Sequence, residues 1–218
     1  MSKIRILHLS DTHICEKNFS SVKSLCEKIA YDLKTNFIKE NEIIDFVVFT
    51  GDLVQSGESK NFDLAFNNII DPIINGLNLE EKKFIYIPGN HEVNVEKISK
   101  IRRLGLEQLL SKKESTENFN FENDSQLYSH MEEYIQFPYS VNFSNDIVTT
   151  QVFSERGYKI GYTLINSACF SNGDSKLDIN SLFVPIHKIK SSLEALKDCN
   201  IKICLMHHPY QFFMDDYK

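Results

Sequence analysis

The feature that most constrains the fold is an alternation of strand-like and helix-like segments in the amino-terminal part of the chain. Runs rich in β-branched and aromatic residues occupy positions 3–9, 43–50 and 83–87. Between them, positions 20–39 and 61–74 place apolar side chains at helical spacing. The order strand, helix, strand, helix, strand predicts an α/β fold class with a parallel sheet and helices on its faces.

Each of these predicted strands ends in a cluster of polar residues. Positions 10–13, 51–52 and 89–92 follow the three strands directly. In an open parallel sheet the carboxyl ends of the strands lie at one edge, and ligands gather there. The sequence therefore predicts a functional site at that edge.

The carboxyl-terminal part returns to strands after a more polar region. Positions 147–153 and 158–165 are typical of a hairpin, 183–196 of a helix, and 201–206 of a last strand. No linker clearly separates two domains, so we expect one domain over residues 1–218.

The region at about 94–140 differs in character and is interpreted as a helical cap inserted into that domain. It contains the strongest local group of positive charges, formed by Lys97, Lys100, Arg102 and Arg103. Such a group is either a solvated helix face or a surface that grips a polyanionic substrate, such as a nucleotide or nucleic acid.

Residues with metal-ligating side chains lie at the predicted strand ends. Asp11 and His13 flank one residue, and side chains two apart on an extended backbone point the same way. Asp52 offers a carboxylate that can bridge two cations, Asn90 an amide oxygen, and His207 an imidazole nitrogen. This mixture of oxygen and nitrogen ligands suits Mn, Fe, Zn or Ni rather than Ca.

The motifs appear in a fixed order, each after a predicted strand. They read Asp11-Thr12-His13, Gly51-Asp52, Gly89-Asn90-His91-Glu92 and His207-His208-Pro209. This ordered set resembles the calcineurin-like metallophosphoesterase superfamily. The resemblance implies a four-layer α/β/β/α sandwich, incomplete at its carboxyl terminus.

The resemblance also implies the ligands of a two-metal centre. Asp11 and His13 would bind the first metal, Asn90 and His207 the second, and Asp52 would bridge both. Manganese is the expected metal, with iron, zinc and nickel as alternatives. A metal-bridging hydroxide would attack phosphate esters, and phosphodiesters such as nucleotides or nucleic acid are favoured as substrates.

His91 would lie beside the phosphate as a general acid or as a stabiliser of the transition state, although it could instead merely orient Asn90. The family's last block, G-H-x-H, does not follow His207. Three explanations are open: the chain is the front part of a longer protein, another segment or subunit completes the site, or the site has decayed. The chain as given is expected to bind metal weakly and to hydrolyse little.

Other residues near the motifs are assigned supporting or ordinary roles. His8 is expected to be a satisfied core or supporting histidine, and His208 to pack or hydrogen-bond next to the metal ligands. Glu92 is expected to hold its loop by hydrogen bonds rather than to touch metal. His130 and His187 are predicted to be surface residues.

The composition limits the setting and the partners. Lys plus Arg total 24 and Asp plus Glu total 30, so a net charge of −6 gives no overall attraction to nucleic acid or an anionic membrane. Five cysteines without CxxC spacing indicate reduced thiols and a cytoplasmic protein. No apolar run approaches the ~20 residues of a membrane span.

Two other functions stay open at this point. A regulatory or interaction module could use a catalytically weak version of the fold as a scaffold. A nuclease subunit would need a DNA-binding surface, which the acidic balance disfavours unless the cap supplies it. The oligomeric state and the natural substrate do not follow from the sequence.

Overall fold

The structure is a computed structural model and describes residues 3–37, 43–100, 102, 104–105 and 127–214. Its centre consists of two three-stranded sheets. The first contains β1 (Ile6–Leu9), β2 (Phe46–Thr50) and β3 (Phe84–Ile87). The second contains β4 (Val148–Glu155), β5 (Tyr158–Ile165) and β6 (Ile201–Leu205).

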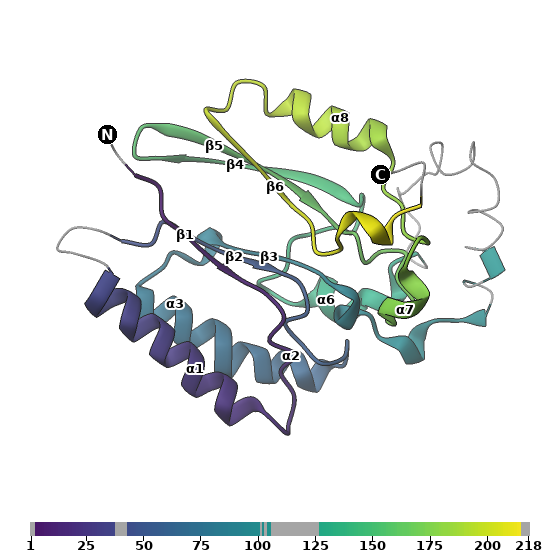
Figure 1. Cartoon of the computed structure of the whole chain (residues 1–218), viewed down its shortest axis with the longest axis horizontal. Helices are drawn as coiled ribbons and strands as arrows, with labels where there is room; N and C mark the ends of the chain where they lie inside the picture. Colours follow the sequence, from purple (N-terminus) through teal and green to yellow (C-terminus); the bar gives the residue numbers. More distant parts are fainter. Residues whose placement is uncertain (1–2, 38–42, 101, 103, 106–126, 215–218) are drawn as a thin grey trace.

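The first sheet is parallel throughout, as the alternation of segments predicted. β2 is its central strand and pairs with β1 on one side and β3 on the other. Every residue of β2 is buried, as is usual for a strand covered on both faces. Its outer face is covered by α1 (Phe19–Asp32), α2 (Ser59–Ala65) and α3 (Asp71–Leu77) (Figure 1).

The helix predicted at 61–74 is interrupted rather than uniform. A π-helical turn, Phe66–Ile70, joins α2 to α3. Pro72 lies in the first turn of α3 and has no N–H to donate to the preceding turn, so the regular α-helical hydrogen bonding is broken there.

The second sheet begins with the predicted hairpin. β4 and β5 pair antiparallel, and their connection places Arg156 at φ 51° and Gly157 at φ 85°, the backbone of a tight two-residue turn. β6 then pairs parallel with β5. The helix predicted from residue 183 begins later, as α8 (Ile186–Ala195), because the residue before Pro185 is disfavoured from helical backbone.

The inner faces of the two sheets meet in a shared apolar core. Phe46 of β2 contacts Phe153 of β4 and Tyr162 of β5, with ring centroids 5.1 and 5.7 Å apart. α8 packs on the outer face of the second sheet, against β4 and β5. The order helices, sheet, sheet, helix confirms the predicted four-layer arrangement (Figure 1).

Part of the predicted cap region lies outside the described residues, at 106–126. The described part contains a short helix, α6 (Glu132–Gln136), and single turns at Val95–Lys97 and Ser129–Met131. Another one-turn helix, α7 (Ser175–Asp178), follows β5. Within the described ranges, no helix combines the length and apolar character that crossing a bilayer requires.

Candidate metal centre

Side chains from the ends of several strands converge at the carboxyl edge of the first sheet. Asp11, Asp52 and His207 place their ligand atoms within 4.8 Å of one another, and so do His13, Asp52 and His91. Asp52 is common to both groups. The structure thus brings together four of the five predicted metal ligands and the predicted catalytic histidine, from the turns after β1, β2, β3 and β6.

The distances inside these groups fit ligands around cations. The His207 Nε2 atom lies 3.5 Å from Asp52 Oδ2, and His13 Nε2 lies 3.7 Å from the same oxygen. His13 Nε2 is 3.9 Å from Asp11 Oδ1. These separations exceed ordinary hydrogen-bond lengths, so the atoms face a common space without bonding to one another. Carboxylate oxygens and imidazole nitrogens in that relation match the donor set of a transition-metal site.

The backbone at the ligands is not extended, which corrects the expectation for Asp11 and His13. Asp11 has φ 56°, His13 φ 46° and Asp52 φ 55°, all in the left-handed region that non-glycine residues rarely occupy. The Asp11 N–H donates to the Gly51 carbonyl at 3.1 Å, and the His13 N–H donates to the Asp52 carbonyl at 3.0 Å. Such backbone costs about 1–3 kcal/mol per residue and tends to occur at functional sites.

Two glycines permit this close approach of the turns. Gly51 has φ 90°, and a Cβ there would lie 2.5 Å from His207 Nδ1. A Cβ on Gly89 would lie 2.8 Å from His207 Nε2 and would also collide with the Asp52 carboxylate. Both glycines are therefore required by space, and Gly51 is also required by its left-handed backbone.

The orientation of His207 is set by the strand beside it. Its Nδ1 donates a hydrogen bond of 2.7 Å to the Thr50 carbonyl, which leaves Nε2 directed at Asp52. Burial alone would lower the pKa of His207, but the attraction of the nearby Asp52 carboxylate outweighs it and raises the pKa to about 9. Burial raises the pKa of Asp52, but His207 and the His91 N–H together lower it by more. The pKa of Asp52 therefore lies below the usual value.

His91 is held by two contacts. Its Nδ1 donates to the Gln55 carbonyl at 2.7 Å, and its backbone N–H donates to Asp52 Oδ1 at 3.0 Å. Its ring lies edge-on to His13, with centroids 4.4 Å apart. Burial, the largest cause, lowers the pKa of His13, with a contribution from the neighbouring His91, so His13 is neutral at physiological pH.

Glu92 supports the turns, as predicted. Its carboxylate is fully buried and accepts hydrogen bonds from the N–H groups of Gly89, Asp52 and Val54 at 2.5, 2.8 and 3.2 Å. These bonds tie the turn after β2 to the turn after β3. Burial and the charge of Asp52 raise the pKa of Glu92.

Asn90 is buried in the single turn that carries His91 and Glu92, and its role as a metal ligand stays a prediction. His8 and His208 have the supporting contacts that were predicted. His8 accepts or donates a 2.7 Å hydrogen bond with the Thr50 hydroxyl. His208 is buried, packs edge-on to His207 with centroids 4.8 Å apart, and bonds to Ser167 Oγ at 2.8 Å.

Sequence reasoning missed the groups that orient the histidines. The carbonyls of Thr50 and Gln55 and the hydroxyl of Ser167 have no motif of their own. A backbone carbonyl carries no residue-specific signal, so these partners become visible only in three dimensions. The position of Thr50 just before Gly51 and Asp52 was the only available hint.

The cap region contains the clearest wrong predictions. His130, predicted to lie on the surface, is fully buried, and its Nε2 lies 3.0 Å from Arg102 Nη2. Lys97 is paired with Glu132 and Glu133 at 2.7 and 2.9 Å. The predicted basic face is therefore not formed by these residues.

The other residues of the basic group differ in their surroundings. Arg102 directs its guanidinium inward, where Nη2 also donates to the Cys169 carbonyl and both Nε and Nη1 are buried. Lys100 is exposed, and Arg103 lies outside the described residues. His187, on α8, is exposed as predicted.

The fold and the site together define the metallophosphoesterase class. The profile of the calcineurin-like phosphoesterase family matches residues 4–217. The chain therefore belongs to the calcineurin-like phosphoesterase family.

The chain was also compared with curated proteins and with solved structures. No curated protein matches the chain. Among solved structures, the chain is similar to Haemophilus influenzae NAD nucleotidase (NadN), with 16% identity and a TM-score of 0.44. The similarity covers 94% of this chain and 38% of that one.

Proposed function

We propose that this protein is a dinuclear metal-dependent phosphoesterase that hydrolyses phosphate esters. The observation that carries the proposal is the sharing of Asp52 between two groups of ligand atoms. A carboxylate has two oxygens and can serve two cations at once. A site for a single ion would not require two groups of ligand atoms that overlap at one buried carboxylate.

The proposed assignment of ligands to each cation follows the family resemblance, whereas the structure groups Asp11 with His207 and His13 with His91 around Asp52. Asp11 and His13 would hold one cation, Asn90 and His207 the other, and Asp52 both. Divalent cations bound there supply a hydroxide nucleophile and polarise the phosphoryl oxygens. Manganese is the proposed metal, because mixed carboxylate, amide and imidazole ligands without thiolate suit it.

His91 is proposed to act on the leaving group. Because its Nδ1 donates to the Gln55 carbonyl, Nε2 is the nitrogen left to carry a proton to an alkoxide or to neutralise phosphoryl charge. Positioned acids of this kind contribute about 10²–10⁴-fold. His91 also belongs to a group of candidate metal ligands with His13, so direct coordination by His91 is the competing role.

Phosphodiesters are proposed in preference to monoesters. A diester carries one negative charge and a monoester up to two. Among the described ion pairs, Asp11 and Asp52 are paired with histidines only. No lysine or arginine among the described residues is ion-paired with either carboxylate. The inward Arg102 and paired Lys97 favour small diesters over long nucleic acid.

The test compares bis-p-nitrophenyl phosphate with p-nitrophenyl phosphate in the presence of Mn²⁺. We expect faster hydrolysis of the diester and loss of both activities in Asp52→Asn. Metal analysis of the purified protein separates an enzyme from a scaffold, since a scaffold needs no bound Mn, Fe, Zn or Ni. Absence of turnover with every divalent metal, in protein that binds metal, would remove the enzyme proposal.

The proposed setting is the cytoplasm. All five cysteines have free thiols, three of them buried at Cys26, Cys169 and Cys199. Burial raises the pKa of Cys26 to about 11 and that of Cys169 to about 12, so both are unreactive. Free thiols are usual in reducing compartments. Fractionation of cells that express a tagged protein tests this placement.

A further inference from the structure

A pocket separate from the metal centre lies between the two sheets, at the opposite end of the sandwich. It has a volume of about 400 Å³. Phe84 lines it and is the first residue of β3, whereas the metal ligands follow the last residue, Ile87. The pocket and the metal centre are therefore at opposite ends of one strand.

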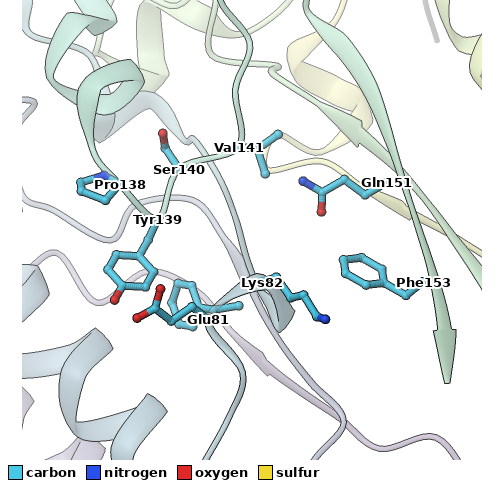
Figure 2. A pocket seen from close by; sticks show the side chains of 9 residues that line it. Glu81, Lys82, Pro138, Tyr139, Ser140, Val141, Gln151 and Phe153 are labelled. Carbon is cyan, nitrogen blue, oxygen red and sulfur yellow. The ribbon is translucent and has the colours of Figure 1, made fainter. Parts of the chain in front are cut away.

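Three aromatic rings form much of the pocket wall (Figure 2). Phe84 and Tyr139 lie on one side with their rings nearly perpendicular, at a centroid distance of 6.1 Å. Phe153 comes from β4 on the other sheet. The segment carrying Tyr139 is fixed to β3, because the Val141 N–H donates to the Tyr86 carbonyl at 3.0 Å. The aromatic surface is thus held in place by backbone structure.

Gln151 is the unusual residue of this wall. It lies two positions before Phe153 on β4, and so on the same face. It is paired with Tyr162, which is fully buried between the sheets. Gln151 therefore points inward, and Figure 2 shows its carboxamide directed into the pocket beside Phe153.

That carboxamide has no protein hydrogen-bond partner among the described residues, and the buried hydroxyl of Tyr162 has none either. Gln151 is half-buried, so its carboxamide stays accessible to a ligand in the pocket. A glutamine that faces inward beside aromatic rings is the arrangement of a binding site, in which few polar groups orient a mostly apolar ligand.

We propose that this pocket binds the nucleobase of a nucleoside or nucleotide. A planar base offers a π-face to Tyr139 and Phe153, and such stacking is a general mode of base recognition. The Gln151 carboxamide both donates and accepts, which matches the paired donor and acceptor on a base edge. A volume of about 400 Å³ is within the range of small-molecule sites. The rim contains both Glu81 and Lys82, so charge does not dominate selection.

The experiment is isothermal titration of the whole chain with adenosine, guanosine, cytidine and uridine, in buffer with EDTA and with ribose as a control. EDTA removes metal, so the result is independent of the proposed phosphoesterase function. We expect at least one nucleoside to bind and ribose not to bind. Gln151→Leu keeps the side-chain size and removes the carboxamide, and should weaken binding about five- to tenfold.

A matched control lies on the same strand. Val152 points to the opposite face and is 47% exposed, so Val152→Thr should leave binding unchanged. Thermal unfolding checks that each variant is folded, and Phe153→Leu, which removes a ring, should also weaken binding. The proposal is overturned if no nucleoside binds at millimolar concentration, or if Gln151→Leu binds as tightly as the unaltered chain.

Discussion

Polar and charged side chains are buried in two regions of the molecule, the turns after β1, β2 and β3 and the segment around α6. The contacts that hold them there differ between the two regions. In the turns, charged and polar residues are gathered by contacts between adjacent strand ends, such as the bond from the Asp11 N–H to the Gly51 carbonyl. Around α6, His130 and Arg102 are buried through contacts outside any sheet, including that with Cys169.

This difference explains which sequence signals were informative. At a strand end, the parallel sheet alone determines that successive turns meet, so the residue order there predicts proximity. In the segment around α6, burial depends on which side chains the rest of the chain presents. From the sequence alone, a charged residue in that segment is predicted to be exposed to solvent, because its partner is not known.

The largest effect is expected for Asp52→Asn, because this substitution removes the carboxylate that both ligand groups share. The amide has one oxygen acceptor and no charge, so both proposed cations lose a ligand. We expect metal content to fall sharply and hydrolysis to drop by more than the roughly 100-fold that losing an outer partner costs. Metal analysis and turnover of the diester check this, with the exposed Asp63→Asn as control. Unchanged metal content would contradict it.

The next effect concerns the support of the turns rather than the metal. In Glu92→Gln, one of the two oxygens that accept from three N–H groups becomes an NH₂ group facing a buried donor. We expect a loss of about 3 kcal/mol in the free energy of unfolding. Urea unfolding in EDTA measures it without metal. Glu96→Gln, at an exposed position, should be neutral, and equal stability of the two variants would show that the turns do not depend on Glu92.

The pH dependence of metal binding provides a more graded test of the same turns. The pKa of His207 is raised to about 9 by Asp52, and a protonated Nε2 cannot bind metal. The pKa values of Asp52 and His13 are lowered, so neither competes for protons above neutrality. Apparent affinity should therefore rise about tenfold per pH unit from pH 7 toward 9, with release of one proton.

Titration calorimetry in buffers of different ionisation enthalpy measures that proton. In His207→Gln the rise should disappear, because the titrating group is gone. A flat pH profile in the unaltered protein would mean that His207 does not ligate the metal.

Some features of the fold and the site could be predicted from the sequence and others could not. The parallel order of the first sheet, the hairpin and the clustering of Asp11, Asp52 and His207 followed from strand patterns and ordered motifs. The left-handed backbone of Asp11 did not, because it depends on hydrogen bonds to a neighbouring turn. The inward position of Arg102 could not be foreseen, since its partners belong to no motif and no strand end.

The smallest effect is expected in the region where prediction failed. Lys97→Met removes exposed ion pairs with Glu132 and Glu133, which are worth about 0–1 kcal/mol. Arg102→Met removes a guanidinium that donates to the buried Cys169 carbonyl and leaves that acceptor without its partner. Lys97→Met should therefore change the free energy of unfolding by no more than about 1 kcal/mol, and Arg102→Met should lower it by about 1–3 kcal/mol.

The same two variants decide whether the region contacts nucleic acid. A lysine or arginine that neutralises a phosphate changes the slope of log affinity against log salt by about 0.9. Because Lys97 is paired and Arg102 is turned inward, the double variant should keep the salt slope of any weak nucleic-acid binding unchanged. A slope reduced by about 2 would show that both side chains turn outward to meet phosphates, which is the second of the two interpretations that the sequence left open.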